Sequence, residues 1–98
     1  MNETTDSKDL RPPDVPSPDA GWEAIGRFAL TYDGYGLAGF DRCAALANGD
    51  EPMRTLEDYR AALFFEQRRW RHFGDEPDSR AMEGIARLLD RIRELAPA

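Results

Sequence analysis

From residue 18 onward, apolar residues recur at spacings of three and four, the period of an amphipathic α-helix. Turn-forming residues divide this pattern into four segments. The pattern therefore predicts an all-α domain over residues 18–98, with four helices built as two helical hairpins. Nine apolar positions on these helices are predicted to be mostly buried, namely Trp22, Ile25, Phe28, Tyr59, Leu63, Trp70, Ile85, Leu89 and Ile92.

The first two helices are bounded by turn residues. Ser17 or Asp19 can cap the first helix, with Pro18 near its first position, and the helix is expected to end at the Asp-Gly-Tyr-Gly turn of residues 33–36. A shorter helix is predicted from about residue 37 to 47, before Asn48 and Gly49. Cys43 falls on its apolar face, so this single cysteine is expected to be a buried structural thiol.

The third and fourth helices have the clearest boundaries. Thr55 and Asp58 have the spacing of a capping box, and Gly74 is suited to a left-handed helix end. The acidic turn 75–78 places Pro77 in the first turn of a fourth helix, so the two helices are expected to form a tight antiparallel hairpin. In that helix apolar residues recur at 3, 4, 3 and 4, while Glu83 and Arg87 are expected on its outer face.

Residues 1–17 have a different composition. They combine three prolines with acidic and small polar residues, and they contain few aliphatic side chains. Such a segment buries too little apolar area to offset the entropy of ordering its backbone. We therefore expect a disordered acidic tail before the helical domain.

The charge and composition exclude several classes of protein. A net charge of −6 disfavours general binding to a phosphate backbone. The chain has no run of 18 apolar residues and no basic-then-apolar start, so neither a membrane span nor a secretory signal is expected. A single cysteine is compatible with a reducing cytoplasm.

The segment 63–74, LFFEQRRWRHFG, concentrates aromatic and cationic side chains on one predicted helix. Its apolar groups occupy more than one helix face, which indicates more than one packing partner. At least one of Phe64 and Phe65 is therefore expected to be exposed in the subunit and covered in a symmetric homodimer. The predicted interaction surface comprises Arg60, Phe64, Phe65, Arg68, Arg69, Arg71 and His72.

Glu66 lies within the apolar stripe of this helix, where an unpaired charge is costly. The favoured interpretation is a buried or half-buried ion pair with an arginine of another helix, such as Arg27 or Arg42. Two alternatives are a position at a subunit interface and an acid with a raised pKa in a ligand site.

Two tyrosines flank an Asp-Gly turn, and this group of Tyr32, Asp33 and Tyr35 is a candidate recognition loop. The favoured alternative is structural. In that interpretation, Tyr32 completes the core face of the first helix and Tyr35 packs across the turn.

No metal-binding or cofactor motif is present, and no nucleophile or phosphate loop supports catalysis. The leading hypothesis is a non-catalytic protein-interaction or regulatory module, homodimeric and with an unidentified protein partner. The alternative is nucleic-acid or nucleotide binding through the cationic and aromatic face of the third helix. A small enzyme that uses Glu66, His72 and the tyrosine loop is the third hypothesis.

Overall fold

The computed structural model describes residues 15–32 and 35–96, except for the side chains of residues 35–38. These residues form an all-α domain, as predicted. A single 3-10 turn, η3 (Pro18–Ala20), precedes the four helices, which are α1 (Trp22–Ala29), α2 (Tyr35–Asn48), α3 (Leu56–Phe73) and α4 (Ser79–Leu95).

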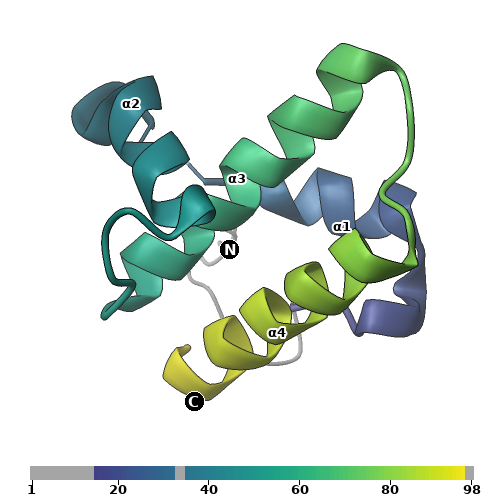
Figure 1. Cartoon of the computed structure of the whole chain (residues 1–98). Coiled ribbons are helices and arrows are strands. Elements are labelled where there is room, and N and C mark those ends of the chain that lie inside the picture. Colours follow the sequence, from purple (N-terminus) through teal and green to yellow (C-terminus); the bar gives the residue numbers. More distant parts are fainter. Residues whose placement is uncertain (1–14, 33–34, 97–98) are drawn as a thin grey trace, which may run out of the picture.

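Helix α3 is the centre of the domain and packs against α1, α2 and α4 (Figure 1). Helix α4 returns along α3 in the opposite direction, so that Arg91 near the end of α4 contacts Tyr59 near the start of α3. The paired helices α2–α3 and α3–α4 thus share α3 as their common member.

Glycines interrupt the first two helices at positions where continuous helix was expected. Gly21 has a φ of 98°, so the segment from Pro18 is a separate 3-10 turn followed by α1. Gly39 has a φ of 81° and kinks α2. These backbone conformations suit glycine because an L side chain rarely adopts them. Helical periodicity alone could not reveal either break.

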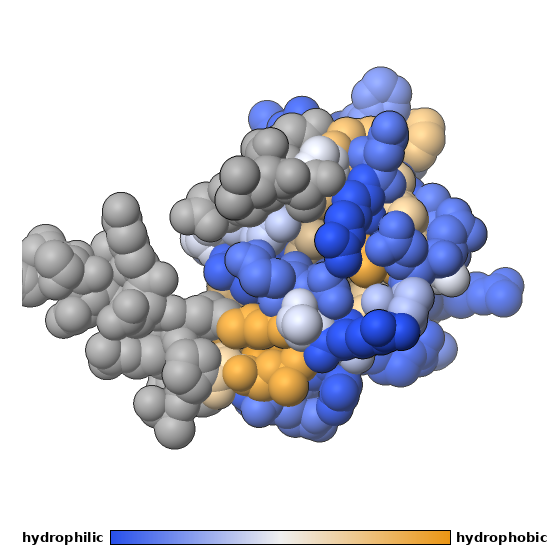
Figure 2. Space-filling model, turned by 90° about the vertical axis from the view of Figure 1, so that its left-hand side faces the viewer, coloured by the Kyte–Doolittle hydropathy of each residue, from blue (hydrophilic) through white to orange (hydrophobic). Residues whose placement is uncertain are grey.

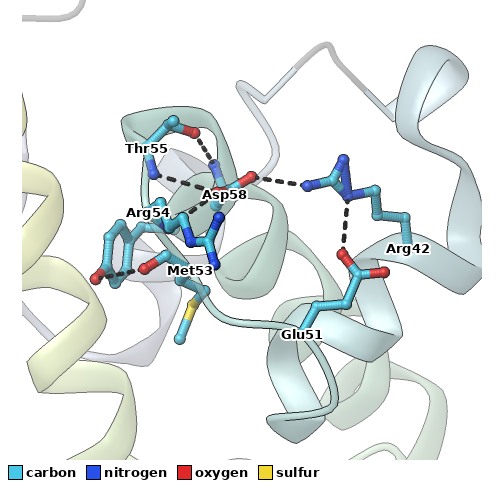
Figure 3. A network of polar contacts seen from close by, with 7 residues as sticks. Arg42, Glu51, Met53, Arg54, Thr55 and Asp58 are labelled. Atoms are coloured by element: carbon cyan, nitrogen blue, oxygen red, sulfur yellow. Dashed lines mark hydrogen bonds and ion pairs between the residues drawn. The ribbon is translucent and has the colours of Figure 1, made fainter.

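The predicted ends of α3 are confirmed. The Thr55 hydroxyl accepts from the Asp58 amide at 3.2 Å, and the Asp58 carboxylate accepts from the Thr55 amide at 3.2 Å (Figure 3). Gly74 ends the helix in the left-handed conformation, with a φ of 71°. Local hydrogen bonding therefore defines both ends of the central helix.

The start of α4 differs from the prediction by one feature. Asp78 is the N-cap, and its carboxylate accepts from the Ala81 amide at 2.8 Å. Pro77 consequently precedes the cap and does not lie in the first turn. Asp78 is favoured at the N-cap because its carboxylate accepts a hydrogen bond from a backbone amide that would otherwise lack a partner.

The core consists of two clusters, which lie on different faces of α3. The larger cluster joins α1, α3 and α4 and includes Val15, which is only 3 % exposed. Arg93 donates to the carbonyl oxygens of Val15 and Pro16, at 2.7 and 3.1 Å. Val15 and Pro16, which precede the predicted domain boundary at residue 18, therefore contact α4. The smaller cluster joins α2 and α3 around the fully buried Cys43.

Six of the nine predicted core residues are buried, including Ile85, Leu89 and Ile92 of the α4 seam. The three large aromatic residues Trp22, Tyr59 and Trp70 are only partly buried. Tyr59 explains why, because its hydroxyl must reach a polar partner and donates to the Met53 carbonyl at 3.2 Å. Large amphipathic rings therefore lie at the margins of the clusters.

Candidate functional site

The two phenylalanines of the predicted interaction surface are packed within the subunit. Phe65 is 9 % exposed, with the Phe40 ring 5.1 Å away and the Arg69 guanidinium 4.9 Å from its centroid. Phe64 is half-buried, and its ring lies 5.7 Å from that of Tyr32. Phe65 is therefore covered within the subunit, whereas Phe64 keeps part of its surface accessible. Self-association of the chain stays a prediction.

The cations of that surface divide into two groups. Arg60 stacks on the rings of Phe28 and Tyr32, and Arg69 donates to the Asn48 side chain at 2.7 Å. Both side chains thus bind α3 to its neighbours. By contrast Arg68, Arg71 and His72 are exposed. Two basic side chains of the predicted surface thus make contacts within the subunit, and the other three are exposed.

The tyrosine loop is only partly described. Tyr32 is 7 % exposed, so it is buried as the structural interpretation expected, but it lies beyond the end of α1 and belongs to the smaller core cluster, not to the core face of the first helix. Burial raises the pKa of its phenol. Asp33 and the side chain of Tyr35 lie outside the described residues, so the recognition loop stays a prediction.

A groove of about 490 Å³ runs between α3 and α4 and reaches the end of α2. Its apolar lining includes Met53, Ala62, Ile85 and Leu88. Four arginines and one acid add charge to this lining, namely Arg69, Arg80, Arg87, Arg91 and Glu66. An apolar hollow with a few charged groups is the usual form of a binding site in proteins.

Three of these arginines form a row along α4. Arg80, Arg87 and Arg91 are separated by seven and four residues, which places them within about 40° of one another around the helix. We call this row the α4 arginine row. Among the described residues, the side chains of Arg80 and Arg87 make no ion pair or hydrogen bond, whereas Arg91 pairs with Glu94 and stacks on Tyr59.

Arg80 and Arg91 are absent from the residues selected from the sequence. Arg87 is expected there on the outer face beside Glu83, but it lines the groove and forms no ion pair with Glu83 within 4 Å. The spacing of seven and four was visible in the sequence. Whether these arginines line a groove depends on which side of α4 faces α3. The apolar pattern locates the buried face of α4 but does not show toward which neighbour the residues at its edge point.

Glu66 extends into this groove from α3, and its side chain is 15 % exposed. The expected ion pair is present, but the expected partners are wrong. Glu66 pairs with Arg69 of its own helix at 3.7 Å, while Arg27 pairs with Glu23 and Arg42 pairs with Glu51 and Asp58. Burial raises the pKa of Glu66, and Arg69 counteracts only part of this effect. The Arg69 guanidinium and the Trp70 side chain thus compensate the burial of this carboxyl group only in part.

Two buried polar atoms of α3 lack hydrogen-bond partners, Trp70 Nε1 and Gln67 Oε1. Trp70 lines the α3–α4 groove, and Gln67 lines a separate hollow between α1 and the end of α3. Buried polar groups without partners are uncommon in folded proteins. The Trp70 side chain nevertheless lies close enough to the Glu66 carboxyl group to lower its pKa, so Gln67 Oε1 is the clearer case of an unsatisfied buried atom.

One face of the molecule is shown in Figure 2, turned from the view of Figure 1. Hydrophilic residues predominate on this face, and apolar residues form one larger area in the lower part of the view and smaller areas elsewhere.

Within the described part of the chain, no group of three His, Cys, Asp or Glu side chains is arranged to hold a metal ion. Nor does any helix there have the length and apolarity to cross a membrane. Comparisons with protein-family models, with curated proteins and with solved structures give no match. Function must therefore be inferred from the groove itself.

Proposed function

We propose that this protein is a non-catalytic module that binds another protein through the groove between α3 and α4. The observation that carries this proposal is the presence of Arg80 and Arg87 without side-chain partners beside an apolar hollow. Arginine is enriched at protein interfaces because its guanidinium pairs with carboxylates while its stem covers apolar surface.

The groove is suited to binding and not to catalysis. Among the described residues, Glu66 is the one carboxyl group in its lining, and no Ser, Cys or His accompanies it there. Acid–base catalysis normally requires a positioned partner for the acid, and nucleophilic catalysis requires a nucleophile beside a base. The chemical capacity of this lining is recognition of apolar and acidic groups.

The alternative of nucleic-acid binding has weaker support. Its proposed stacking surface requires accessible Phe64 and Phe65 rings, but Phe65 is buried under Arg69 and Phe40. Base stacking on a single-strand binder uses exposed aromatic faces. A heparin column provides a direct check, because retention that falls with salt would favour this alternative.

A random peptide library tests the proposed function. We expect peptides selected on the immobilised protein to lose binding to Gly84→Leu, because the new side chain would project into the groove. Gly84 is helical, and a Cβ there meets only the end of Arg87 at 3.9 Å, so the variant should fold. Arg68→Glu is the matched control, since Arg68 is exposed and lies outside the groove lining. Selected peptides that bind the Gly84→Leu protein as well as the parent would refute the proposal.

A further inference from the structure

We propose that the partner segment is an acidic amphipathic helix, with carboxylates facing the α4 arginine row and apolar side chains entering the groove. This inference rests on the proposed function and specifies the chemistry of its partner. Three features of the groove support it: its local charge, the spacing of its cations and the open backbone at Gly84.

The groove has the opposite charge to the rest of the chain. Its lining carries four arginines against one acid, whereas the whole chain has a net charge of −6. Opposite potentials across an interface favour binding and suppress wrong partners. The unpaired guanidinium groups of Arg80 and Arg87 therefore favour a partner that supplies carboxylates.

The spacing of the row indicates a helical partner. Arg80, Arg87 and Arg91 follow one another by about 10.5 and 6 Å along α4, at the usual helical rise. A second helix in the groove has the same rise, so its residues i, i+7 and i+11 match the row if the helices are parallel. The pattern i, i+4 and i+11 matches it if they are antiparallel. The common helical rise thus determines which residues of the partner helix face the three arginines of the row.

The backbone at Gly84 permits a close approach. Gly84 lies between Arg80 and Arg87 in the groove lining, and within the described part of the chain a Cβ at Gly84 would meet only the Arg87 side chain, at 3.9 Å. A glycine inside a helix costs about 0.5 to 1 kcal/mol relative to alanine. Small residues allow two helices to approach one another closely. Apolar side chains of the partner would enter beside Gly84 and contact Ile85 and Leu88.

The outer flank of α4 limits how the acidic helix can lie. Glu83, Asp90 and Glu94 are exposed beside the arginine row, where Asp90 pairs with Arg93 and Glu94 with Arg91. Carboxylates placed over this flank would be repelled. The acids of the partner must therefore follow the inner row, between α3 and α4. The same flank opposes the broad phosphate backbone of a nucleic acid.

The probe is a synthetic amphipathic peptide of about 15 residues, with glutamates at the positions that match the row and leucines toward the groove. Parallel and antiparallel patterns are made separately. Control peptides keep the composition but move the glutamates to the opposite helix face. Fluorescence anisotropy on the full chain measures affinity, and ¹⁵N NMR reports which backbone amides shift.

We expect one matched peptide to bind at least about tenfold more tightly than its control and to shift the Gly84 amide. Arg87→Glu should weaken the matched peptide at least about tenfold, and a peptide with lysine at the facing position should recover binding to this variant. Arg68→Glu should change affinity less than about twofold, since Arg68 lies outside the groove lining.

Equal binding of matched and control peptides would overturn the proposal that the partner is an acidic amphipathic helix. If library-selected peptides still depended on the groove, the proposed function would survive. Two other occupants would also overturn the proposal. If amide substitution of Glu3, Asp6 and Asp9 shifted the groove resonances without added peptide, the acidic segment of the same chain would be the occupant. If those resonances moved with protein concentration in step with light scattering, a second copy would occupy the groove.

Discussion

The start of α3 and the groove between α3 and α4 differ in how their charged groups are paired. At the start of the helix, the Asp58 carboxylate accepts from the amides of Arg54 and Thr55 and pairs with Arg42 at 3.2 Å (Figure 3). In the middle, Glu66 has one ion pair at 3.7 Å. We call the first region the Asp58 network. The Asp58 carboxylate is bound by other groups of this domain. By contrast, Arg80 and Arg87 of the groove have no side-chain partner among the described residues.

The pKa values of the two acids reflect this difference. Burial opposes ionisation of Asp58, but the two backbone amides and Arg42 together lower its pKa. Burial also opposes ionisation of Glu66, and there Arg69 and the Trp70 side chain together are insufficient, so the pKa is raised. Charged groups that the fold fully satisfies serve stability. Charged groups that it leaves unsatisfied are available for a partner.

The largest expected effect comes from the core that supports both regions. Leu89 is fully buried, and Leu89→Ala should lower the free energy of unfolding by about 2 to 5 kcal/mol through lost burial and a cavity. Chemical denaturation followed by circular dichroism measures the change. Leu95→Ala provides the control, because Leu95 is 38 % exposed. A Leu89→Ala protein that melts within a degree or two of the parent would show that the two regions do not share this core.

Removal of the Asp58 network should have the next largest effect. Asp58→Ala is expected to cost about 1 to 2 kcal/mol at neutral pH, because it removes a helix cap and leaves Arg42 with Glu51 alone. The exposed neighbour Glu57→Ala serves as the control. Because the folded pKa of Asp58 is lowered, its stabilisation is present at neutral pH and is lost as the pH falls through that folded pKa. An unchanged acid-unfolding curve for Asp58→Ala would contradict the structural role of the network.

Most of this first region could be predicted from the sequence. Thr55, Asp58 and Gly74 act through atoms a few residues away, so their spacing was sufficient to locate the ends of α3. The role of Arg42 in the same network was not predicted, because it depends on how α2 packs against α3. The groove required the same tertiary information. Arg80 and Arg87 form part of a site only because α4 turns that edge toward α3.

A smaller effect with the opposite pH dependence is expected at Glu66. The raised pKa means that the folded state favours the protonated acid, so its contribution is greatest below the ordinary pKa of glutamate and is lost as the pH rises toward the folded value. The stability of the Glu66→Gln protein relative to the parent should therefore increase as the pH rises through this range. Denaturation of both proteins at a series of pH values measures the difference. A stability difference that does not vary with pH would show that Glu66 is solvated as well in the folded state as in the unfolded chain.

The smallest effect on stability is expected from the α4 arginine row. Arg80→Gln and Arg87→Gln should each change the free energy of unfolding by no more than about 0.5 kcal/mol, because these side chains make no ion pair in the described domain. Arg42→Gln is the informative contrast, since Arg42 belongs to the Asp58 network. If the groove variants lost as much stability as Arg42→Gln, the distinction between the two regions would fail.

The contact between Arg93 and Val15 joins residues 78 positions apart in the chain. Contacts of such large sequence separation require closure of most of the chain, and they are expected to form after the local helix pairs. Val15 is therefore expected to pack against α4 only after the rate-limiting step of folding. Val15→Ala keeps the carbonyl that Arg93 binds but removes a buried side chain, so it should accelerate unfolding while leaving the refolding rate nearly unchanged, as stopped-flow measurements can show. The lifetime of the folded domain is therefore controlled in part by a residue that lies before its first helix.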